Sequence, residues 1–296
     1  MSDRDTAARR PLLPRQPLSL GDVIEGAVAL LRATASTAGR VVVVVYAPLA
    51  VLNALALTTT GEVDPRDPFA SLTSGDVTLL ALSSIIGFVA APLVGAVLTW
   101  LAVDRARGGS ASWVDAYGAA AGVFRRVVLA TLLILLLGLV AVIVVAIPAG
   151  LGAMAGPEVA VLTLLALGVP VLLILLSLSY LLVPAVVVED AGPGAAVRRA
   201  WELLRVRLWP TLGVVVVAGL LAGLVSAAVG LVTTAVGSVA GPASFVVEAV
   251  GSTLSAMVTV PFLTYAALLV YVGAVVRLEG PDALPVPRDR EGTGTG

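Results

Sequence analysis

The sequence predicts an all-α membrane protein with six transmembrane helices, arranged as three parallel repeats. Three observations lead to this fold class. Apolar residues make up 59% of the chain and charged residues only 12%, about half the charged share of a soluble domain. Runs of about 20 apolar residues recur, which is the length that crosses roughly 30 Å of hydrocarbon. A similar segment of 14 residues precedes alternate runs.

The six apolar runs predict the transmembrane helices in order along the chain. They cover residues 41–59, 77–103, 127–147, 159–188, 211–236 and 245–276. The fourth and sixth runs are longer than one crossing requires. Tilt, a kink at Pro170 or Pro261, or a short helix outside the membrane would absorb the excess length. Pro92 and Pro184 also interrupt even-numbered runs.

The two ends of the chain predict the limits of the membrane domain. Residues 1–16 are polar and rich in arginine and proline, with no apolar stretch typical of a cleavable signal peptide. Residues 281–296 contain too few apolar side chains to bury a surface. We expect both ends to be disordered cytoplasmic tails, so that the membrane domain covers residues 17–280.

The arginines predict the orientation. Lysine is absent, and 17 of the 18 basic residues fall on one side of the six runs. The other side has only Arg66, which lies among acidic residues. Because cytoplasmic connections are enriched in arginine and lysine, both termini are expected to face the cytoplasm. The use of arginine alone, with abundant Ala, Val, Gly and Leu, is typical of a GC-rich, actinobacterial genome, so the expected location is the bacterial cytoplasmic membrane.

Three segments of 14 residues align before the odd-numbered runs. Each ends on an arginine that follows two apolar residues, and the segments read SLGDVIEGAVALLR (19–32), SWVDAYGAAAGVFR (112–125) and GPGAAVRRAWELLR (192–205). The even-numbered runs carry matching triplets at 98–100, 178–180 and 263–265. We therefore expect three repeats of a cytoplasmic amphipathic helix followed by a two-helix hairpin. The repeats cover about residues 17–104, 110–190 and 191–279, and their pseudo-axis is expected to follow the membrane normal.

The starts of the first two segments predict helix caps. Ser19 precedes Asp22 by three residues, and Ser112 precedes Asp115 in the same way. This spacing is typical of a capping box, with aspartate in place of the usual glutamate. Helices are therefore expected to begin at both serines.

The third segment has the clearest amphipathic pattern. Its apolar stripe is predicted to consist of Val197, Trp201, Leu204 and Leu208. Charged residues occupy the opposite face, as in helices that lie in the membrane interface with arginines toward anionic headgroups. The candidate contacts to lipid headgroups in the three segments are Arg32, Arg125, Arg198, Arg199, Arg205 and Arg207.

Small residues predict where helices pack closely in lipid. In the second run such residues recur every four positions, at Ser83, Gly87, Ala91 and Gly95. In the fifth run they lie at Gly219, Gly223, Ser226 and Gly230. Both stripes are candidate helix–helix contact faces, although glycine and alanine are abundant throughout this chain.

One amide side chain and one carboxylate side chain fall within the apolar runs. Asn53 lies near the middle of the first run. An unpaired amide there would cost several kcal/mol of folding free energy. We therefore expect its side chain to hydrogen-bond a neighbouring helix or to line a polar pocket. Glu248 lies 29 residues before Arg277, about 43 Å along a continuous helix. This distance places Glu248 at the outer headgroup level, where it would be an ordinary interfacial residue. Alternatively, Glu248 is a carboxylate that binds a substrate or a coupling ion.

The residue content narrows the possible chemistry. Cysteine and histidine are absent, which excludes disulfides, histidine-ligated metals and Ser-His-Asp triads. No phosphate-binding loop, nucleophile elbow or zinc-protease motif occurs. We expect no enzymatic activity, metal or cofactor. An enzyme acting on lipids would require Glu189, Asp190 and Asp104 to gather into one metal site.

Two stretches carry a resemblance to a known family. They are residues 17–32, PLSLGDVIEGAVALLR, and residues 187–207, VVEDAGPGAAVRRAWELLRVR. Over about residues 17–280 the chain resembles a bacterial, largely actinobacterial family of six-span proteins similar to the membrane domain of glycerophosphoryl diester phosphodiesterase. The resemblance implies six spans with amphipathic cytoplasmic helices. It implies no catalytic residues, because in enzymes that this family resembles hydrolysis is expected from a separate soluble barrel domain with histidine and acidic metal ligands.

Together these features favour a non-enzymatic scaffold or accessory subunit that interacts with anionic lipids of the inner leaflet. A protein partner or a homo-oligomer is expected. A nucleic-acid partner is not expected, because the negative charges of Glu202, Glu189 and Asp190 offset the positive charge of the arginines near the third segment. The alternative is a small transporter or channel with a pathway between the kinked even-numbered helices. A transporter predicts polar side chains around a cavity at the membrane midplane, whereas a scaffold predicts a dry centre packed by small residues.

Overall fold

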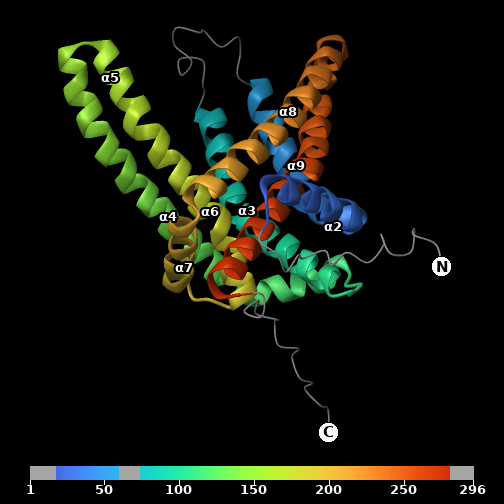
Figure 1. Ribbon diagram of the computed structural model, residues 1–296. Helices are drawn as coiled ribbons and strands as arrows, with labels where there is room; N and C mark the ends of the chain where they lie inside the picture. The colour runs from blue at the N-terminus through green and yellow to red at the C-terminus, as the bar shows by residue number, and fades with distance from the viewer. Residues whose placement is uncertain (1–17, 60–73, 281–296) are drawn as a thin grey trace. The chain divides into compact units, whose positions relative to one another are not determined.

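A computed structural model describes residues 18–59 and 74–280, and these residues form helices without any β-strand (Figure 1). The predicted tails, 1–16 and 281–296, lie outside the described residues. The long helices are α2 (Leu20–Thr59), α3 (Ser74–Ala106), α4 (Trp113–Ala155), α6 (Val169–Glu189), α8 (Leu208–Ala240) and α9 (Ser244–Glu279). The shorter elements are α5 (Pro157–Thr163), the π-helix η1 (Leu164–Gly168), α7 (Pro193–Val206) and the 3₁₀ turn η2 (Gly241–Ala243).

Six helical stretches in the described residues are long and apolar enough to cross a membrane. They are Leu20–Leu55, Val77–Ala106, Trp113–Ala155, Pro157–Glu189, Leu208–Ala240 and Ser244–Glu279. Each one contains one of the six predicted apolar runs or nearly all of it, and the predicted all-α, multi-pass membrane fold is confirmed.

The helices contribute to two compact units, which are described separately. Unit 1 comprises Met1–Val23, Gly122–Val215 and Ala267–Gly296. Unit 2 comprises Ile24–Ala121 and Val216–Ala266.

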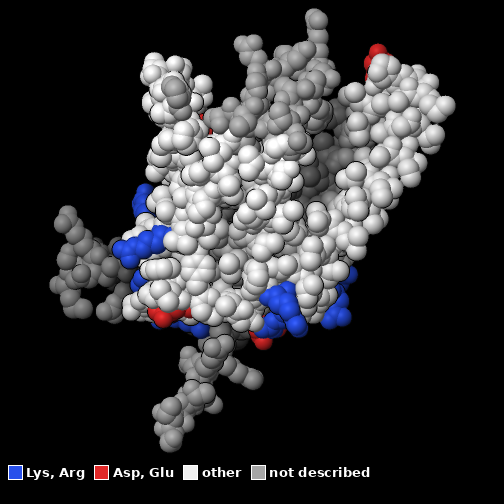
Figure 2. All heavy atoms as spheres, turned by 180° about the vertical axis from the view of Figure 1, so that it is seen from behind, with Lys and Arg blue, Asp and Glu red and all other residues white. Residues whose placement is uncertain are grey.

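A long hairpin is the most exposed part of unit 1. The later part of α4 runs beside α5, η1 and α6 (Figure 1). Gly168 approaches Val145 across the hairpin, and Gly138 approaches Leu175. Figure 2 shows the sides of this hairpin, at the upper right, as a continuous uncharged surface. Such a surface matches a hairpin that faces lipid chains.

In unit 2, small residues and hydroxyl groups join α2 to the first part of α9. The Thr34 and Tyr265 hydroxyls lie 2.7 Å apart, and both side chains are buried. Ala50 and Ala54 pack against Ala249. Alanine side chains and hydroxyl groups therefore lie where α2 and α9 come close together, as expected for helices that associate in lipid.

The two predicted glycine stripes have different outcomes. In α3, a Cβ added at Gly87 would lie 3.3 Å from a methyl carbon of Leu49 in α2, so this position is a helix contact. In α8, a Cβ added at Gly219, Gly223 or Gly230 would meet no described atom within 4 Å. The α8 stripe nevertheless meets α9 at its serine, because the Ser226 and Ser255 hydroxyls lie 2.9 Å apart. The contact thus lies at the serine and not at the glycines.

The predicted amphipathic segments all begin helices at their second residue. These residues are Leu20, Trp113 and Pro193, where α2, α4 and α7 begin. In the first two copies the segment continues without a break into the transmembrane helix, and only the third copy is a separate helix. The fifth and ninth positions are buried in all three copies, as Val23, Ala116 and Ala196 and as Ala27, Ala120 and Ala200. These shared features fit the predicted repeat, which itself stays a prediction.

Pro210 explains why α7 is separate. If α7 continued, the ring of Pro210 would clash with the carbonyl of Val206, four residues earlier, and α7 ends at Val206. Pro210 is tolerated in the first turn of α8, where backbone N–H groups have no partner within the helix. The matching positions in the other two copies are Thr37 and Ala130, which keep their N–H groups and allow the helix to continue.

The predicted kink at Pro170 coincides with a local change in helix type. The π-helix η1 lies directly before it, at Leu164–Gly168, and α6 follows. A wider turn accommodates the carbonyl groups that a proline leaves without a donor.

Candidate functional site

An ion-pair network in unit 1 joins α6, α7 and α9. The Arg199 guanidinium of α7 contacts Glu189, at the end of α6, with an Nε–Oε1 distance of 2.8 Å. It also contacts Glu279, at the end of α9, with an Nη2–Oε1 distance of 2.5 Å. The fully buried Tyr271 donates its hydroxyl hydrogen to Glu189. One arginine therefore connects residues that lie 90 positions apart in the chain.

The electrostatics of this network favour the charged form of Arg199. Burial alone lowers the pKa of its guanidinium, but hydrogen bonds and attraction from Glu189 and Glu279 outweigh that effect and raise the pKa above its ordinary value. The Arg199 side chain is only 17% exposed. A charge with so little water around it requires compensating partners, so the network has a structural role.

The buried face of α7 differs from the predicted stripe. Its buried residues are Ala196, Ala200, Leu203 and Leu204. Arg199 lies on this same face, because positions three and four residues apart share a side of a helix. Of the four residues of the predicted stripe, Trp201 is 46% exposed and only Leu204 is buried. The prediction placed Arg199 on the water-facing side and is corrected here: its carboxylate partners, Glu189 and Glu279, lie on two other helices, α6 and α9.

Both predicted capping boxes are confirmed. The Asp22 carboxylate accepts hydrogen bonds from the Ser19 backbone N–H at 2.8 Å and from the Ser19 hydroxyl at 2.6 Å. The Ser19 hydroxyl oxygen in turn accepts from the Asp22 N–H at 3.3 Å. Ser112 and Asp115 make the same three bonds, at 2.9, 2.6 and 3.3 Å. The local sequence alone determines where these helices begin.

The six candidate headgroup arginines fall into three groups. Arg32, Arg125 and Arg205 are exposed, and the described residues provide them with no ion-pair partner. Arg198 is also exposed, and its Nε lies 3.8 Å from a carboxylate oxygen of Glu202. Arg199 belongs to the buried network. Arg207 lines a cavity in unit 1.

Arg126 has a role that the sequence reasoning missed. Its guanidinium lies 2.6 Å from the carboxylate of Asp190 and donates a hydrogen bond of 2.7 Å to the Asp190 carbonyl. Asp190 follows α6 in the left-handed conformation, with φ of 54°, which aspartate adopts more readily than most residues. Arg126 thus holds the end of α6 against α4. The Gly-Pro pair at 192–193 was the sequence signal that α6 ends nearby.

The two candidate polar residues in the spans are not brought into one site by any described contact. Asn53 is partly exposed in α2, and its amide has no hydrogen-bond partner among the described residues. Glu248 is exposed near the start of α9. Its backbone carbonyl accepts a hydrogen bond from Ser252 at 2.8 Å. The functional roles considered for both residues stay predictions.

The acidic residues required by the lipid-enzyme hypothesis have other partners. The Asp104 carboxylate accepts a hydrogen bond of 3.1 Å from the Ala111 N–H and thereby caps the connection between α3 and α4. Glu189 and Asp190 bind the arginines described above. No group of three or more acidic, histidine or cysteine side chains that could hold a metal ion lies within the described ranges.

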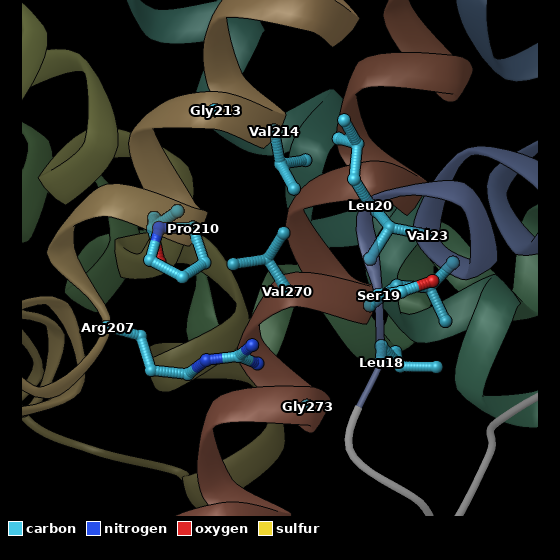
Figure 3. A pocket seen from close by; sticks show the side chains of 12 residues that line it. Leu18, Ser19, Leu20, Val23, Arg207, Pro210, Gly213, Val214, Val270 and Gly273 are labelled. Atoms are coloured by element: carbon cyan, nitrogen blue, oxygen red, sulfur yellow. The ribbon is translucent and has the colours of Figure 1, made fainter.

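A cavity of about 170 Å³ lies within unit 1, between the start of α2, the start of α8 and the later part of α9 (Figure 3). Its walls are mostly apolar, with Val23, Val214 and Leu269 among them. Figure 3 shows Arg207 extending its guanidinium toward this space from the side of α8. The described residues provide the Arg207 guanidinium with no carboxylate. Burial and the nearby charge of Arg277 lower the pKa of Arg207 below its ordinary value.

Comparison with protein families gives one result. A family model described as a domain of unknown function, DUF7847, matches residues 18–274. Comparison with curated proteins and with solved structures finds no match. The matched residues include all six candidate transmembrane helices except the last turn of α9, and the chain therefore belongs to the DUF7847 family.

Proposed function

We propose that the protein is a non-enzymatic scaffold or accessory subunit of the bacterial cytoplasmic membrane, and that it binds anionic lipids of the inner leaflet. One observation supports this role above the others: the described carboxylates with defined partners hold the protein's own helices together. Glu189 and Glu279 bind Arg199, and Asp190 binds Arg126. Asp22, Asp104 and Asp115 cap helices or a connection.

Exposed arginines support the lipid-binding part of the proposal. Arg32, Arg125 and Arg205 are exposed at equivalent positions, the last residues of the three 14-residue segments. An arginine near an anionic leaflet contributes about 1 kcal/mol to surface attraction. Three such side chains would give the protein a preference for phosphate-bearing headgroups.

The orientation that we propose places both termini in the cytoplasm. The sequence has no cysteine, so single cysteines can report it. We expect Ser110→Cys, in the connection between α3 and α4, to react with a membrane-impermeant maleimide only after cell lysis. Glu158→Cys, in the first turn of α5, should react in intact spheroplasts. The reverse labelling pattern would contradict the orientation.

The scaffold role predicts a stable assembly. The full chain, extracted with its surrounding lipids into nanodiscs, should appear in native mass spectrometry as a homo-oligomer or with a stoichiometric partner. It should also carry anionic lipid, which the triple variant Arg32→Gln, Arg125→Gln, Arg205→Gln should lose. A lipid-free monomer that lets small solutes leave vesicles would contradict the proposal.

That contrary outcome would favour the alternative, a small transporter or channel. Two buried hydroxyls support this alternative: those of Thr99 in α3 and Ser177 in α6 have no hydrogen-bond partner among the described residues. Both helices are even-numbered spans, as the alternative requires. If solute flux is found, Thr99→Val and Ser177→Ala should reduce it.

We propose that the resemblance to the actinobacterial six-span family and to the phosphodiesterase membrane domain concerns architecture alone. The three-copy arrangement fits it, since matching positions of the segments begin helices and are buried. The activity of the phosphodiesterase is not part of the proposal.

A further inference from the structure

The cavity of unit 1 is polar at one end and apolar along its walls. Arg207 lies directly before Leu208, the first residue of the transmembrane helix α8. This position is where a span meets the headgroup layer. From there the cavity is lined by Val214 of α8 and by Leu269 and Val270 of α9 (Figure 3). The polar end thus lies at the end of the span, and the apolar walls lie along it.

Two polar groups at this cavity have no partner among the described residues. The Arg207 guanidinium is half-buried and makes neither an ion pair nor a hydrogen bond there. Thr211, one turn further along α8, is only 2% exposed, lines the cavity and leaves its hydroxyl unbonded. The Thr211 hydroxyl is therefore available to donate a hydrogen bond to a ligand in the cavity. Ser19, on the opposite wall, already uses its hydroxyl in the capping box with Asp22.

The charges near the polar end have one sign. Arg277 is close enough to lower the pKa of Arg207, and burial lowers it further. Asp22 does not line the cavity, and its carboxylate accepts two hydrogen bonds from Ser19. An anion beside Arg207 would therefore gain a charge-assisted hydrogen bond and relieve the repulsion between the two arginines.

We propose that this cavity is a binding site for one anionic phospholipid. Its phosphate would contact Arg207 and the Thr211 hydroxyl, and a stretch of one acyl chain would occupy the space between α8 and α9. The volume agrees with this division. About 170 Å³ is below the 300–1,000 Å³ of sites that enclose a whole drug-sized ligand, so the cavity would hold only part of a lipid. The rest of the lipid would remain in the bilayer.

This inference rests on the lipid-binding role proposed above and assigns that role a specific site. The test uses the purified full chain in detergent, with native mass spectrometry to count bound lipids. The probes are phosphatidylglycerol and phosphatidylcholine with identical acyl chains. We expect one phosphatidylglycerol molecule to bind in preference to phosphatidylcholine.

Two variants and one control identify the site. Arg207→Gln should weaken phosphatidylglycerol binding by about tenfold to a hundredfold, the usual effect of losing a charge-assisted hydrogen bond. Gly213→Leu should fill the cavity and reduce binding of both lipids, because an added Cβ meets nothing within 4 Å there. Arg40→Gln removes an equal charge from an exposed position that is neither in the cavity lining nor among the proposed headgroup arginines, and it should bind phosphatidylglycerol as the unmodified chain does.

Thermal midpoints of all variants would show whether each one is folded. A folded Arg207→Gln variant with unchanged phosphatidylglycerol binding would overturn the site. Displacement of the lipid by inorganic phosphate alone, or tighter binding of a free fatty acid, would overturn the assignment to a phospholipid. If the triple variant at Arg32, Arg125 and Arg205 loses anionic lipid while Arg207→Gln keeps it, only the cavity site fails. If neither variant changes lipid retention, the proposed lipid-binding role fails as well.

Discussion

Replacing Arg199 by methionine should lower the free energy of unfolding by about 2–3 kcal/mol. Methionine keeps much of the apolar stem but removes the charge between Glu189 and Glu279. The two carboxylates would then remain close together without a cation, and the Tyr271 hydroxyl would be the only described side-chain donor left to Glu189. The ends of α6 and α9 would repel each other across α7.

The magnitude follows from the exposure of the network. Loss of one partner from a fully buried ion pair costs about 3–5 kcal/mol, whereas an exposed pair contributes about 0–1 kcal/mol. The side chains of Arg199, Glu189 and Glu279 are 17%, 22% and 36% exposed. Water reaches them, Glu279 most of all, so the expected cost lies between these two limits.

Arg198 provides a matched control at the adjacent position. Its side chain is 77% exposed and lies 3.8 Å from Glu202, so Arg198→Met should change stability by less than about 0.5 kcal/mol. Thermal unfolding of the full chain in detergent, followed by tryptophan fluorescence, would measure both variants. The midpoint of Arg199→Met should fall by roughly 4–12 °C, at about 2–4 °C for each kcal/mol lost from a chain of this size.

A compensated variant separates the charge effect from a packing effect. Changing Glu189 and Glu279 to glutamine in the Arg199→Met background removes the two unpaired charges. Stability should then recover in part, because a neutral network carries a smaller desolvation cost than an unpaired buried charge. Equal midpoints for Arg198→Met and Arg199→Met would refute the reasoning, as would a compensated variant less stable than Arg199→Met alone.

Two further predictions concern helix packing and helix starts. A Cβ added at Gly251 would lie 1.9 Å from the Thr233 methyl carbon, so Gly251→Ala should destabilise the protein by about 1–3 kcal/mol. Gly223→Ala, where nothing lies within 4 Å, should be neutral or slightly stabilising; equal thermal midpoints for both variants would show that the close contact is absent. Ser112→Ala should cost about 1 kcal/mol by removing the cap of α4, measured by the same unfolding assay. Ser110→Ala, two residues before, should cost little, and a cost equal to that of Ser112→Ala would contradict the capping role.

The glycine stripes show why packing partners were harder to predict than the spans. Gly87 and Gly223 lie in similar patterns of small residues, yet only Gly87 has a close neighbour, Leu49. A small residue permits a close approach but does not bring a second helix to it. The neighbour is determined by the whole arrangement of helices, which no local window of sequence contains.

The amphipathic helix α7 gives the same lesson for the ion network. In the sequence, Trp201 favoured a stripe that placed Arg199 toward water. The structure buries the alanine face instead, and Trp201 remains exposed, where lipid or an interface can accept an aromatic side chain. The position of Arg199 between Ala196 and Leu203 was a usable signal, because a charge within a buried stripe predicts a buried partner.

The sequence by itself determined the six spans and the two capping boxes. Each depends on properties of neighbouring residues: about 20 apolar side chains in a row satisfy the bilayer, and a serine and an aspartate three residues apart satisfy the first N–H groups of a helix. The break at Pro210 belongs to the same class, since its clash involves a carbonyl four residues away. Only the tertiary structure decided that Arg199 binds Glu189 and Glu279. It also placed Arg207 beside an apolar cavity. Both arrangements join side chains of different helices, which meet only when the helices pack.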